Sequence, residues 1–391
     1  MPNGVFNSKY FNEKAFGAYY DTIPQERLNL LIKSGILQPN RRIKELFSNQ
    51  TGSEYGIIPM TGRLKGKPVN YDGTTSYGNA KTLTSYKQGV VCIGRKDKFF
   101  EDDFTYDITS KKDFMSQIAD QLADYWDTAW EDILMTIVSG LFAMTSTAGL
   151  EFIQKHTHDI TGQSTTVMEE STLNTALQKA CGDRRRKFAV VCANSLVCSN
   201  LENKKLVTNL RYNDANGIER DLNLYTWNGK ILVEYDAITE QNGYVASTSS
   251  TTGALLVVAD SATPSTGEIK LGDVKASDYY PAGVKATDYV LADTRYVTYV
   301  FGKGAFDYED IGAKKPHEMF RDADNDRDYL YERQRKVIMP HGISYLMQSQ
   351  VTDSPTDAEL ANGANWDLVM GSDNAPYDHR EIAIARIISK G

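Results

Sequence analysis

The sequence is poor in cysteine and has no long hydrophobic run. It holds four cysteines in 391 residues, none in a C-x-x-C pair: Cys92, Cys181, Cys192 and Cys198. Each lies in or beside an apolar stretch, which predicts buried free thiols in a reducing compartment. No apolar stretch reaches the ~18 residues of a membrane span, and the N-terminus lacks the basic region and apolar run of a signal peptide. We therefore expect neither a membrane protein nor a disulfide-stabilised secreted domain.

Basic charge is also scarce. The chain has 43 Lys and Arg against 51 Asp and Glu, a formal net charge of -8. A dedicated nucleic-acid binder would show a basic surplus, so this class is disfavoured. One basic cluster stands out, Arg184-Arg185-Arg186-Lys187, and we interpret it as a solvated turn or as an ion-pair patch between subunits.

Familiar catalytic motifs are missing as well. There is no G-x-S-x-G, and His317-Glu318 is followed by Arg321, where a zincin has its second histidine. Gly302-Lys303-Gly304 has no third glycine at the offset of a dinucleotide-binding motif, so we interpret it as a tight turn between strands. We predict no catalytic residue and no cofactor.

Two groups of metal-ligating residue types have the wrong spacing. Four aspartates alternate as at the start of a calcium loop: Asp322, Asp324, Asp326 and Asp328. Arg327 stands where that loop needs glycine, and Arg333 where it needs a bidentate glutamate. We interpret the segment as acidic and solvated, or as an ion-pair partner of nearby arginines. His156 and His158 have no third ligand at a suitable spacing, and we predict no metal site.

One long amphipathic pattern is present, from Ser110 to Met144. Ser110 and Asp113 form an acidic variant of a capping box, and apolar residues then recur every three or four positions. About 34 residues at ~1.5 Å each give a rod of roughly 50 Å. We predict a long helix over 110–144, suited to an elongated molecule; the alternative is a helical hairpin broken near Gly140.

The segments before this helix lack a core of their own. Residues 1–49 are interpreted as an arm. Residues 50–97 hold two strand candidates, Tyr55–Met60 and Thr82–Ile93, around a glycine-rich stretch with Arg63, Lys65 and Lys67. Because an isolated two-stranded ribbon is marginal in water, we expect this projecting loop to pack on a neighbour. We interpret 97–109 as an acidic, aromatic connector.

The second half of the chain has an α/β pattern. After a polar stretch at 145–170 that we expect to be irregular, Ser171 begins a helix, Phe188–Ala193 is a buried strand, and Asn228-Gly229 is a strong hairpin signal. Strands are also expected at Tyr289–Ala292, Arg295–Phe301, Arg335–Met339, Ile343–Met347 and Glu381–Ile388. We predict one mixed α/β domain over 171–331, inserted after the long helix.

This order of segments resembles the major capsid proteins of tailed bacteriophages, whose fold also occurs in encapsulin compartments. The stretch from Arg295 to Phe306 (RYVTYVFGKGAF), continued by Arg333 to Tyr345 (RQRKVIMPHGISY), is similar to coat proteins of phages infecting Gram-positive bacteria. The resemblance implies an α+β fold with four parts: an N-terminal arm (1–49), an extended loop (50–97), a peripheral domain (98–170 and 332–391) with 110–144 as its spine helix, and an axial domain (171–331).

The resemblance also implies a structural, non-enzymatic protein. Such chains self-assemble as pentamers and hexamers into an icosahedral shell around double-stranded DNA, which is bound without sequence specificity, in the cytoplasm of the host bacterium. A separate scaffolding protein, a portal and a decoration protein are the other candidate partners. The expected assembly contacts are Arg63, Lys65, Lys67, Arg184, Arg185, Arg186, Gly302, Lys303 and Gly304.

Three alternatives remain open on the sequence. An encapsulin-type shell would have the same fold and a protein cargo. A polysaccharide hydrolase would use a carboxylate pair such as Glu169 with Glu170, or Asp307 with Glu309. A tail-tube subunit is the third alternative, although such proteins are usually shorter and lack a long helix.

Overall fold

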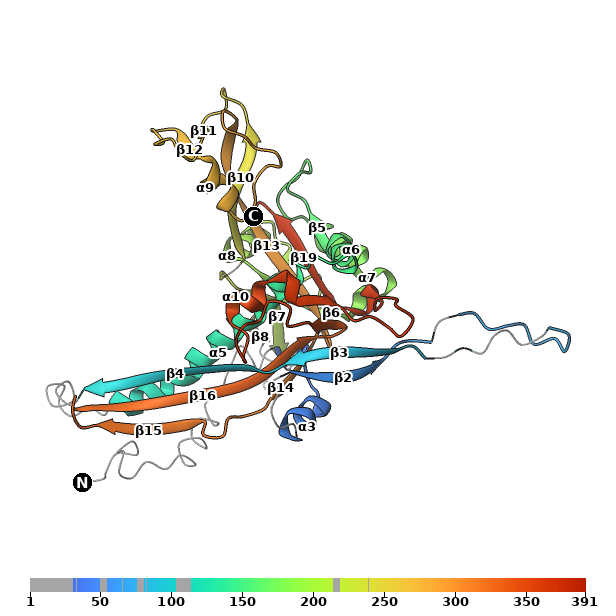
Figure 1. Cartoon of the computed structure of the whole chain (residues 1–391). Helices are drawn as coiled ribbons and strands as arrows, with labels where there is room; N and C mark the ends of the chain where they lie inside the picture. Colours follow the sequence, from blue (N-terminus) through green and yellow to red (C-terminus); the bar gives the residue numbers. More distant parts are fainter. Residues whose placement is uncertain are drawn as a thin grey trace. The chain divides into compact units, whose positions relative to one another are not determined.

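A computed structural model of the chain describes residues 31–32, 34–49, 55–64, 66–75, 81, 83–102, 114–213, 219–237 and 239–391 (Figure 1). The chain forms two compact units. Unit 1 comprises Met1–Ile153 and Lys303–Ile382, and unit 2 comprises Gln154–Gly302 and Ala383–Gly391. Each unit is thus assembled from segments that are far apart in the sequence.

The main sheet of unit 1 is five-stranded. Its members are β1 (Leu37–Pro39), β4 (Ile93–Asp102), β14 (Phe306–Asp310), β15 (His317–Asp322) and β16 (Arg327–Pro340). The long strand β16 is central: β4 pairs antiparallel with it from Ile93↔Lys336 to Asp102↔Arg327, and β15 and β14 pair with its other edge. The strand β1 extends the sheet by parallel pairing with β14.

The helix α5 (Phe114–Leu141) covers one face of this sheet. Trp130 donates its indole N–H to the Oε1 of Gln334 on β16 at 2.7 Å, and the Tyr125 ring meets Phe99 of β4 edge-on. Its buried residues follow the predicted spacing: Leu122, Trp126, Trp130, Ile133, Ile137 and Leu141. The predicted long helix is confirmed over 114–141. It ends at Leu141, one residue past Gly140 and three before the predicted end at Met144, and the predicted cap at Ser110 and Asp113 lies outside the described residues.

Smaller elements complete unit 1. They are α3 (Arg41–Asn49), β2 (Tyr55–Thr61), β3 (Ser85–Val91), β17 (Ile343–Tyr345), α10 (Asp357–Ala361), η2 (Gly363–Asn365), β18 (Trp366–Leu368) and η3 (His379–Glu381). The pairs β2–β3 and β17–β18 are both antiparallel. The predicted two-stranded ribbon at 55–93 is confirmed by the pairing of β2 with β3.

Unit 2 is built on a ten-stranded mixed sheet. Its strands are β5 (Thr157–Asp159), β6 (Phe188–Ala193), β7 (Val207–Asn213), β8 (Glu219–Trp227), β9 (Lys230–Glu234), β10 (Glu240–Ser247), β11 (Leu255–Val258), β12 (Glu268–Lys270), β13 (Tyr289–Gly302) and β19 (Ile384–Ser389). The long strand β13 pairs with β6, β10, β11 and β19. Around the sheet lie α7 (Thr172–Cys181), η1 (Gly182–Lys187), α8 (Ser195–Asn203) and α9 (Leu271–Ala276).

The helix predicted after Ser171 and the Asn228-Gly229 hairpin are confirmed in unit 2, although Ser171 makes no side-chain cap hydrogen bond. The apolar face of α7 is buried against β6 and β19, and Gly182 follows its last residue with φ at 59°. Asn194 caps α8 by accepting a hydrogen bond from the Leu196 N–H. Asn228 and Gly229 both have positive φ, 49° and 74°, between the paired strands β8 and β9, as a type I′ hairpin requires.

Three local predictions are wrong. Residues 97–102, predicted as part of a connector over 97–109, belong to the strand β4, because their alternating side chains find a partner more than 200 residues away in β16; residues 103–109 lie outside the described residues. The stretch 145–170 is not wholly irregular, since it contains α6 (Thr147–His156) and β5. The two strands expected at 289–301 are one strand, β13, because its partners follow one another along its length.

The boundaries of the two compact units differ from the boundaries of the predicted domains. Residues 303–331, which we placed in the axial domain, lie in unit 1, and residues 154–170 and 383–391, which we placed in the peripheral domain, lie in unit 2. The physical reason is strand pairing: β14 and β15 bond to β16, whereas β5 bonds to β19 and β19 to β13.

Candidate assembly surfaces

Nearly all described residues of the loop between β2 and β3 are exposed. In Figure 1 it projects as a long blue loop from the β2–β3 ribbon. Its described apolar side chains are open to solvent: Leu64 at 63%, Val69 at 45%, Tyr71 at 92% and Leu83 at 56% exposure. Apolar side chains that are exposed singly are normal on a protein surface, so a role of this loop in assembly stays a prediction.

Two of the three basic residues predicted on this loop are placed by the structure. Arg63 lies 3.6 Å from the Oε1 of Glu381, and Lys67 accepts a hydrogen bond at its carbonyl from the Lys81 ammonium. Lys65 lies outside the described residues. Near the tip, the Thr75 hydroxyl and the N–H groups of Thr74 and Thr75 hold the pKa of Asp72 below its usual range.

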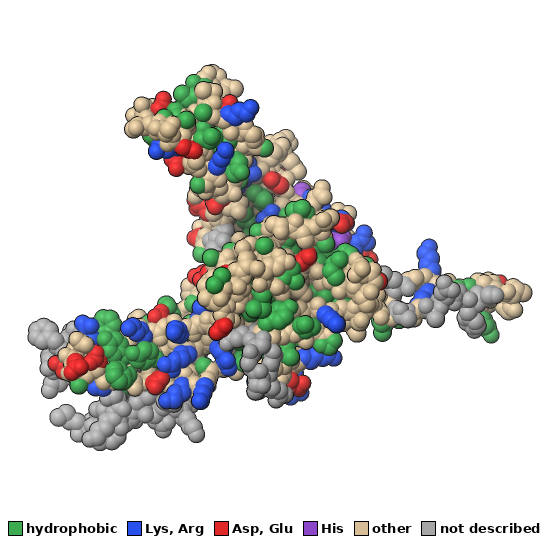
Figure 2. Space-filling model, in the orientation of Figure 1, with side chains coloured by type: hydrophobic (Ala, Val, Ile, Leu, Met, Phe, Trp, Pro, Cys, Tyr) green, Lys and Arg blue, Asp and Glu red, His purple; other side chains and the backbone are tan. Residues whose placement is uncertain are grey.

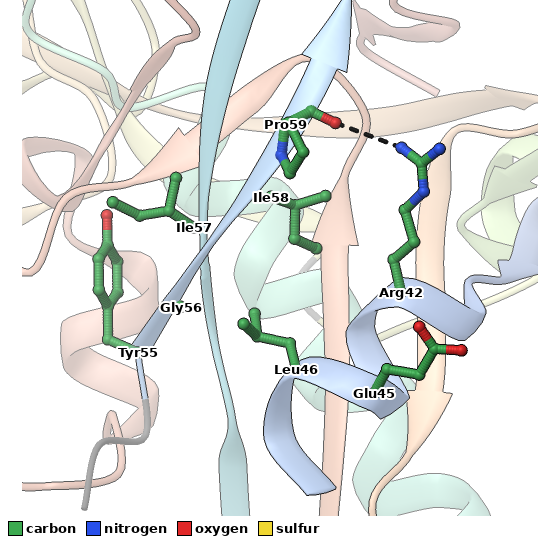
Figure 3. A pocket seen from close by; sticks show the side chains of 8 residues that line it. All are labelled: Arg42, Glu45, Leu46, Tyr55, Gly56, Ile57, Ile58 and Pro59. Atoms are coloured by element: carbon green, nitrogen blue, oxygen red, sulfur yellow. Dashed lines mark hydrogen bonds between the residues drawn. The ribbon is translucent and has the colours of Figure 1, made fainter. Parts of the chain in front are cut away.

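A groove lies between α3 and the strand β2 (Figure 3). Its volume is about 740 Å³, and eight residues line it: Arg42, Glu45, Leu46, Tyr55, Gly56, Ile57, Ile58 and Pro59. The Gly62 N–H donates to Thr84 on the β3 side, whereas the Pro59 carbonyl accepts from the Arg42 guanidinium at 3.5 Å. The backbone N–H and C=O groups of the odd-numbered residues of β2 therefore point away from β3. They form the outer edge of β2, and no described strand pairs with this edge.

The basic cluster predicted in unit 2 lies on η1. Arg185 and Arg186 are exposed, and the cluster runs directly into the buried strand β6. Gly302 ends β13 beside it: a Cβ there would stand 2.5 Å from the Ala383 Cβ and 3.0 Å from the Lys187 carbonyl oxygen. Close packing therefore explains why position 302 holds glycine, and a role of Gly302 in assembly stays a prediction.

Lys303 and Gly304 form the predicted tight turn between β13 and β14. Gly304 has φ at 69°, and its N–H donates to the Gly35 carbonyl at 2.7 Å. The Lys303 side chain is exposed next to the same glycine turn. The structure thus places the described contact residues on the loop, on η1, at the end of β13 and in the turn that follows it.

A fourth surface was missed by sequence reasoning. Because Trp130 bonds Gln334, the even-numbered residues of β16 face α5, and the odd-numbered residues form the opposite face, which we call the outer face. Directly paired residues share a face, so the outer face carries cations and aromatic rings from three strands: Lys96, Lys98 and Phe100 of β4, Phe320 of β15, and Arg327, Tyr329, Tyr331, Arg333 and Arg335 of β16.

Cations on this face lie against aromatic rings. The Lys98 ammonium is 5.5 Å from the Tyr329 ring centre, Arg327 is 5.0 Å from that of Phe100, and Arg333 is 5.8 Å from that of Tyr331. Phe100 and Phe320 are 51% and 55% exposed. The period-two alternation of Arg327 to Arg335 was visible in the sequence, but the partner strand β4 was not.

The inner face of the same sheet buries ionisable groups. The Nδ1 of His317 is 2.6 Å from the Oε1 of Glu332, and burial raises the pKa of Glu332. Arg321 forms ion pairs with Asp326 at 3.6 Å and Asp328 at 3.4 Å, which confirms the ion-pair interpretation of the aspartate segment. Among the described residues, no group of three or more His, Cys, Asp or Glu has an arrangement suited to a metal ion.

Comparison with known proteins places these surfaces in a known fold. The major capsid protein of Bacillus phage SPP1 is 35% identical over 91 residues, which cover 23% of this chain and 26% of that protein. The capsid of Ralstonia phage GP4 superposes with a TM-score of 0.51 at 9% identity, covering 92% of this chain and 88% of that one. The capsid of cyanophage Pam1 gives a TM-score of 0.48 at 11% identity. No family model matches the sequence.

The chain therefore has the fold of a phage capsid protein, and the predicted α+β capsid fold is confirmed. Sequence similarity to the SPP1 protein spans about a quarter of that relative's length. None of the described helices is long and apolar enough to cross a membrane.

Proposed function

We propose that this chain is the structural subunit of a phage capsid, a major capsid protein that self-assembles into a closed shell. The observation that carries the proposal is the 35% identity to the SPP1 major capsid protein over 91 residues, found in a chain whose fold matches a phage capsid over 92% of its length. The subunit acts through its surfaces and has no catalytic role. The exposed loop, the β2 edge and the outer face suit this role, because a shell protein needs several surfaces that contact its copies.

The finer features follow the same proposal. The subunits form pentamers and hexamers that close into an icosahedral shell around double-stranded DNA, assembled in the bacterial cytoplasm with scaffolding, portal and decoration proteins as partners. Residues 50–97 act as the extended loop over a neighbouring subunit. The rest of unit 1, apart from the arm at 1–49, serves as the peripheral domain with α5 as its spine, and unit 2 as the axial domain.

Particle size tests the proposal directly. The chain is expressed alone and together with a candidate scaffolding protein, then examined by light scattering and negative-stain microscopy. Hollow shells or capsomer rings are the expected result. A monodisperse monomer or dimer under every condition would contradict the proposal. The cargo of native particles separates the two shell classes: nuclease-protected DNA supports a phage capsid, and a protein cargo without DNA supports an encapsulin-type compartment.

A further inference from the structure

The outer face of the β4–β16–β15 sheet is divided into three zones along its length. The hairpin between β15 and β16 forms an acidic tip that holds Asp322, Asp324 and Asp326, while the fourth aspartate, Asp328, faces α5. An aromatic zone follows: Phe100, Phe320, Tyr329 and Tyr331. A basic zone comes last: Lys96, Lys98, Arg333 and Arg335. Figure 2 shows this order where Figure 1 draws these strands, with acidic side chains at the far end, then hydrophobic ones, then basic ones.

Acidic and basic zones in one subunit are too far apart to neutralise each other. Lys96 pairs with Arg333, which is six residues from Arg327 at the tip, roughly 20 Å at ~3.3 Å per residue. Exposed charges are largely screened beyond about 8 Å at physiological ionic strength. Each zone therefore presents its own charge to whatever lies against it.

Local ion pairs leave both zones with a net charge. Apart from Arg321 and Asp328, which face α5, the tip holds Arg327 and three aspartates, and the Asp324 carboxylate has no cation partner among the described residues. In the basic zone, Glu318 holds Arg333 at 2.9 Å, while Lys96 has no carboxylate partner in the described part of the chain. The tip is a net anion, and the basic zone is a net cation.

We propose that the outer faces of two neighbouring copies meet in antiparallel orientation, so that the acidic tip of each lies on the basic zone of the other and the aromatic zones pack between them. The proposal rests on the proposed function, in which the chain assembles with itself. Such a contact is isologous, with the same patch on both subunits. In the antiparallel orientation, the acidic end of each face meets the basic end of the other. In a parallel orientation, zones of like charge would meet.

Double-stranded DNA fits this face less well than a second copy does. The phosphate backbone would be repelled by the acidic tip. The exposed rings of Phe100 and Phe320 offer no hydrogen bond, and duplex DNA keeps its bases stacked away from them. A second copy would pack its own aromatic rings against the aromatic zone and would place an opposite charge against each charged zone.

Cross-linking with introduced cysteines tests the contact in assembled particles. In the variant Lys96→Cys/Asp324→Cys, the two positions of one subunit are roughly 20 Å apart, far beyond the ~7 Å Cα limit of a disulfide. The four native cysteines are buried. Mild oxidation should therefore give covalent dimers in particles of the double variant, and none with Lys96→Cys or Asp324→Cys alone. Particles of the double variant that stay uncross-linked would overturn the proposal.

Reversal of the charges, followed by rescue in a combined variant, is the second test of the contact. Lys96→Glu and Asp324→Lys should each lower the yield of particles at least about tenfold, because like charges then face each other in the contact. The combined variant Lys96→Glu/Asp324→Lys should recover most of the yield. A yield unchanged by both single reversals, or a combined variant no better than either, contradicts the contact. Lys96→Glu particles that form normally but retain less DNA would reassign the face to DNA.

Particle formation by the wild-type chain is measured first, because it distinguishes a failure of the proposed function from a failure of the antiparallel contact. If the wild-type chain forms no particles with any scaffold, the proposed function fails. If it forms particles and the cross-link and rescue both fail, only the antiparallel contact is wrong. Circular dichroism of each soluble variant identifies a variant that does not fold.

Discussion

Ionisable side chains inside unit 1 are held away from water by the sheet and α5. Glu332 is fully buried, and its Oε2 has no hydrogen-bond partner among the described residues. The other carboxyl oxygen of Glu332, Oε1, lies 2.6 Å from the Nδ1 of His317. A buried carboxylate prefers its protonated form because low-polarity surroundings penalise the charge, so Glu332 should make stability depend on pH.

The sign of that dependence follows from the raised pKa of Glu332. The native carboxyl keeps its proton to a higher pH than the unfolded one, so the free energy of unfolding falls as the pH rises from about 4.5 through the native pKa, by about 1.4 kcal/mol per unit of pKa difference. Glu332→Gln removes this titration. Urea unfolding of the unassembled subunit should show wild type losing stability relative to Glu332→Gln between pH 4.5 and 7, and parallel profiles would contradict this.

The cysteines give a second prediction at the scale of single residues. All four are buried, and burial raises the pKa of the Cys198 thiol to about 12. Because the thiolate is the reactive species, iodoacetamide at pH 8 should leave the native subunit unmodified and alkylate all four cysteines in denaturant. Mass spectrometry measures both states. Rapid alkylation of the native subunit would show that a thiol is accessible.

Among the elements, α5 depends on one glycine near its end. A Cβ at Gly140 would stand 2.1 Å from the Leu360 carbonyl oxygen and 2.8 Å from the Trp366 Nε1. That indole N–H donates to the same carbonyl at 2.8 Å. The glycine thus permits α10 and the segment after it to approach the helix backbone closely, although glycine is a weak helix former.

Gly140→Ala separates these two effects. Helix propensity alone predicts stabilisation by up to ~1 kcal/mol, whereas overpacking predicts destabilisation by about 1–3 kcal/mol. We expect the second outcome in urea unfolding. Thr128→Ala, at an exposed position of the same helix, is the matched control and should change the free energy of unfolding by less than about 0.5 kcal/mol. A Gly140→Ala variant more stable than wild type would refute the packing argument.

For the whole molecule, we expect the loop between β2 and β3 to matter for assembly and not for folding. The register places Gly62 opposite Thr84, so replacing residues 63–83 with Asn-Gly should close β2 and β3 into a two-residue hairpin. The variant should fold, because the loop lies outside the core, yet fail to form shells. Circular dichroism and light scattering measure the two properties, and normal particles from this variant would remove the loop from the assembly surfaces.

The capsid fold could be predicted from the sequence, because the order and type of the helices and strands define it. The α5 pattern, the β2–β3 ribbon and the Asn228-Gly229 hairpin depend on residues close in the chain, and their local preferences agree with the final fold. Of the candidate contact residues, Lys303 and Gly304 lie in the tight turn that their glycine pattern predicted. These features were determined by the sequence alone because each is encoded within a few neighbouring residues.

Only the tertiary structure decided the limits of the two compact units and the composition of the outer face. Residues 93–102 became the strand β4 through pairing with residues 327–336, and Gly302 proved to be a packing residue because Ala383 and Lys187 approach it. The zones of charge on the outer face come from three strands, two of them distant from β4 in the sequence. Strand pairing across such separations has no local signature, because hydrogen bonding between strands is set by which edges meet in the folded core.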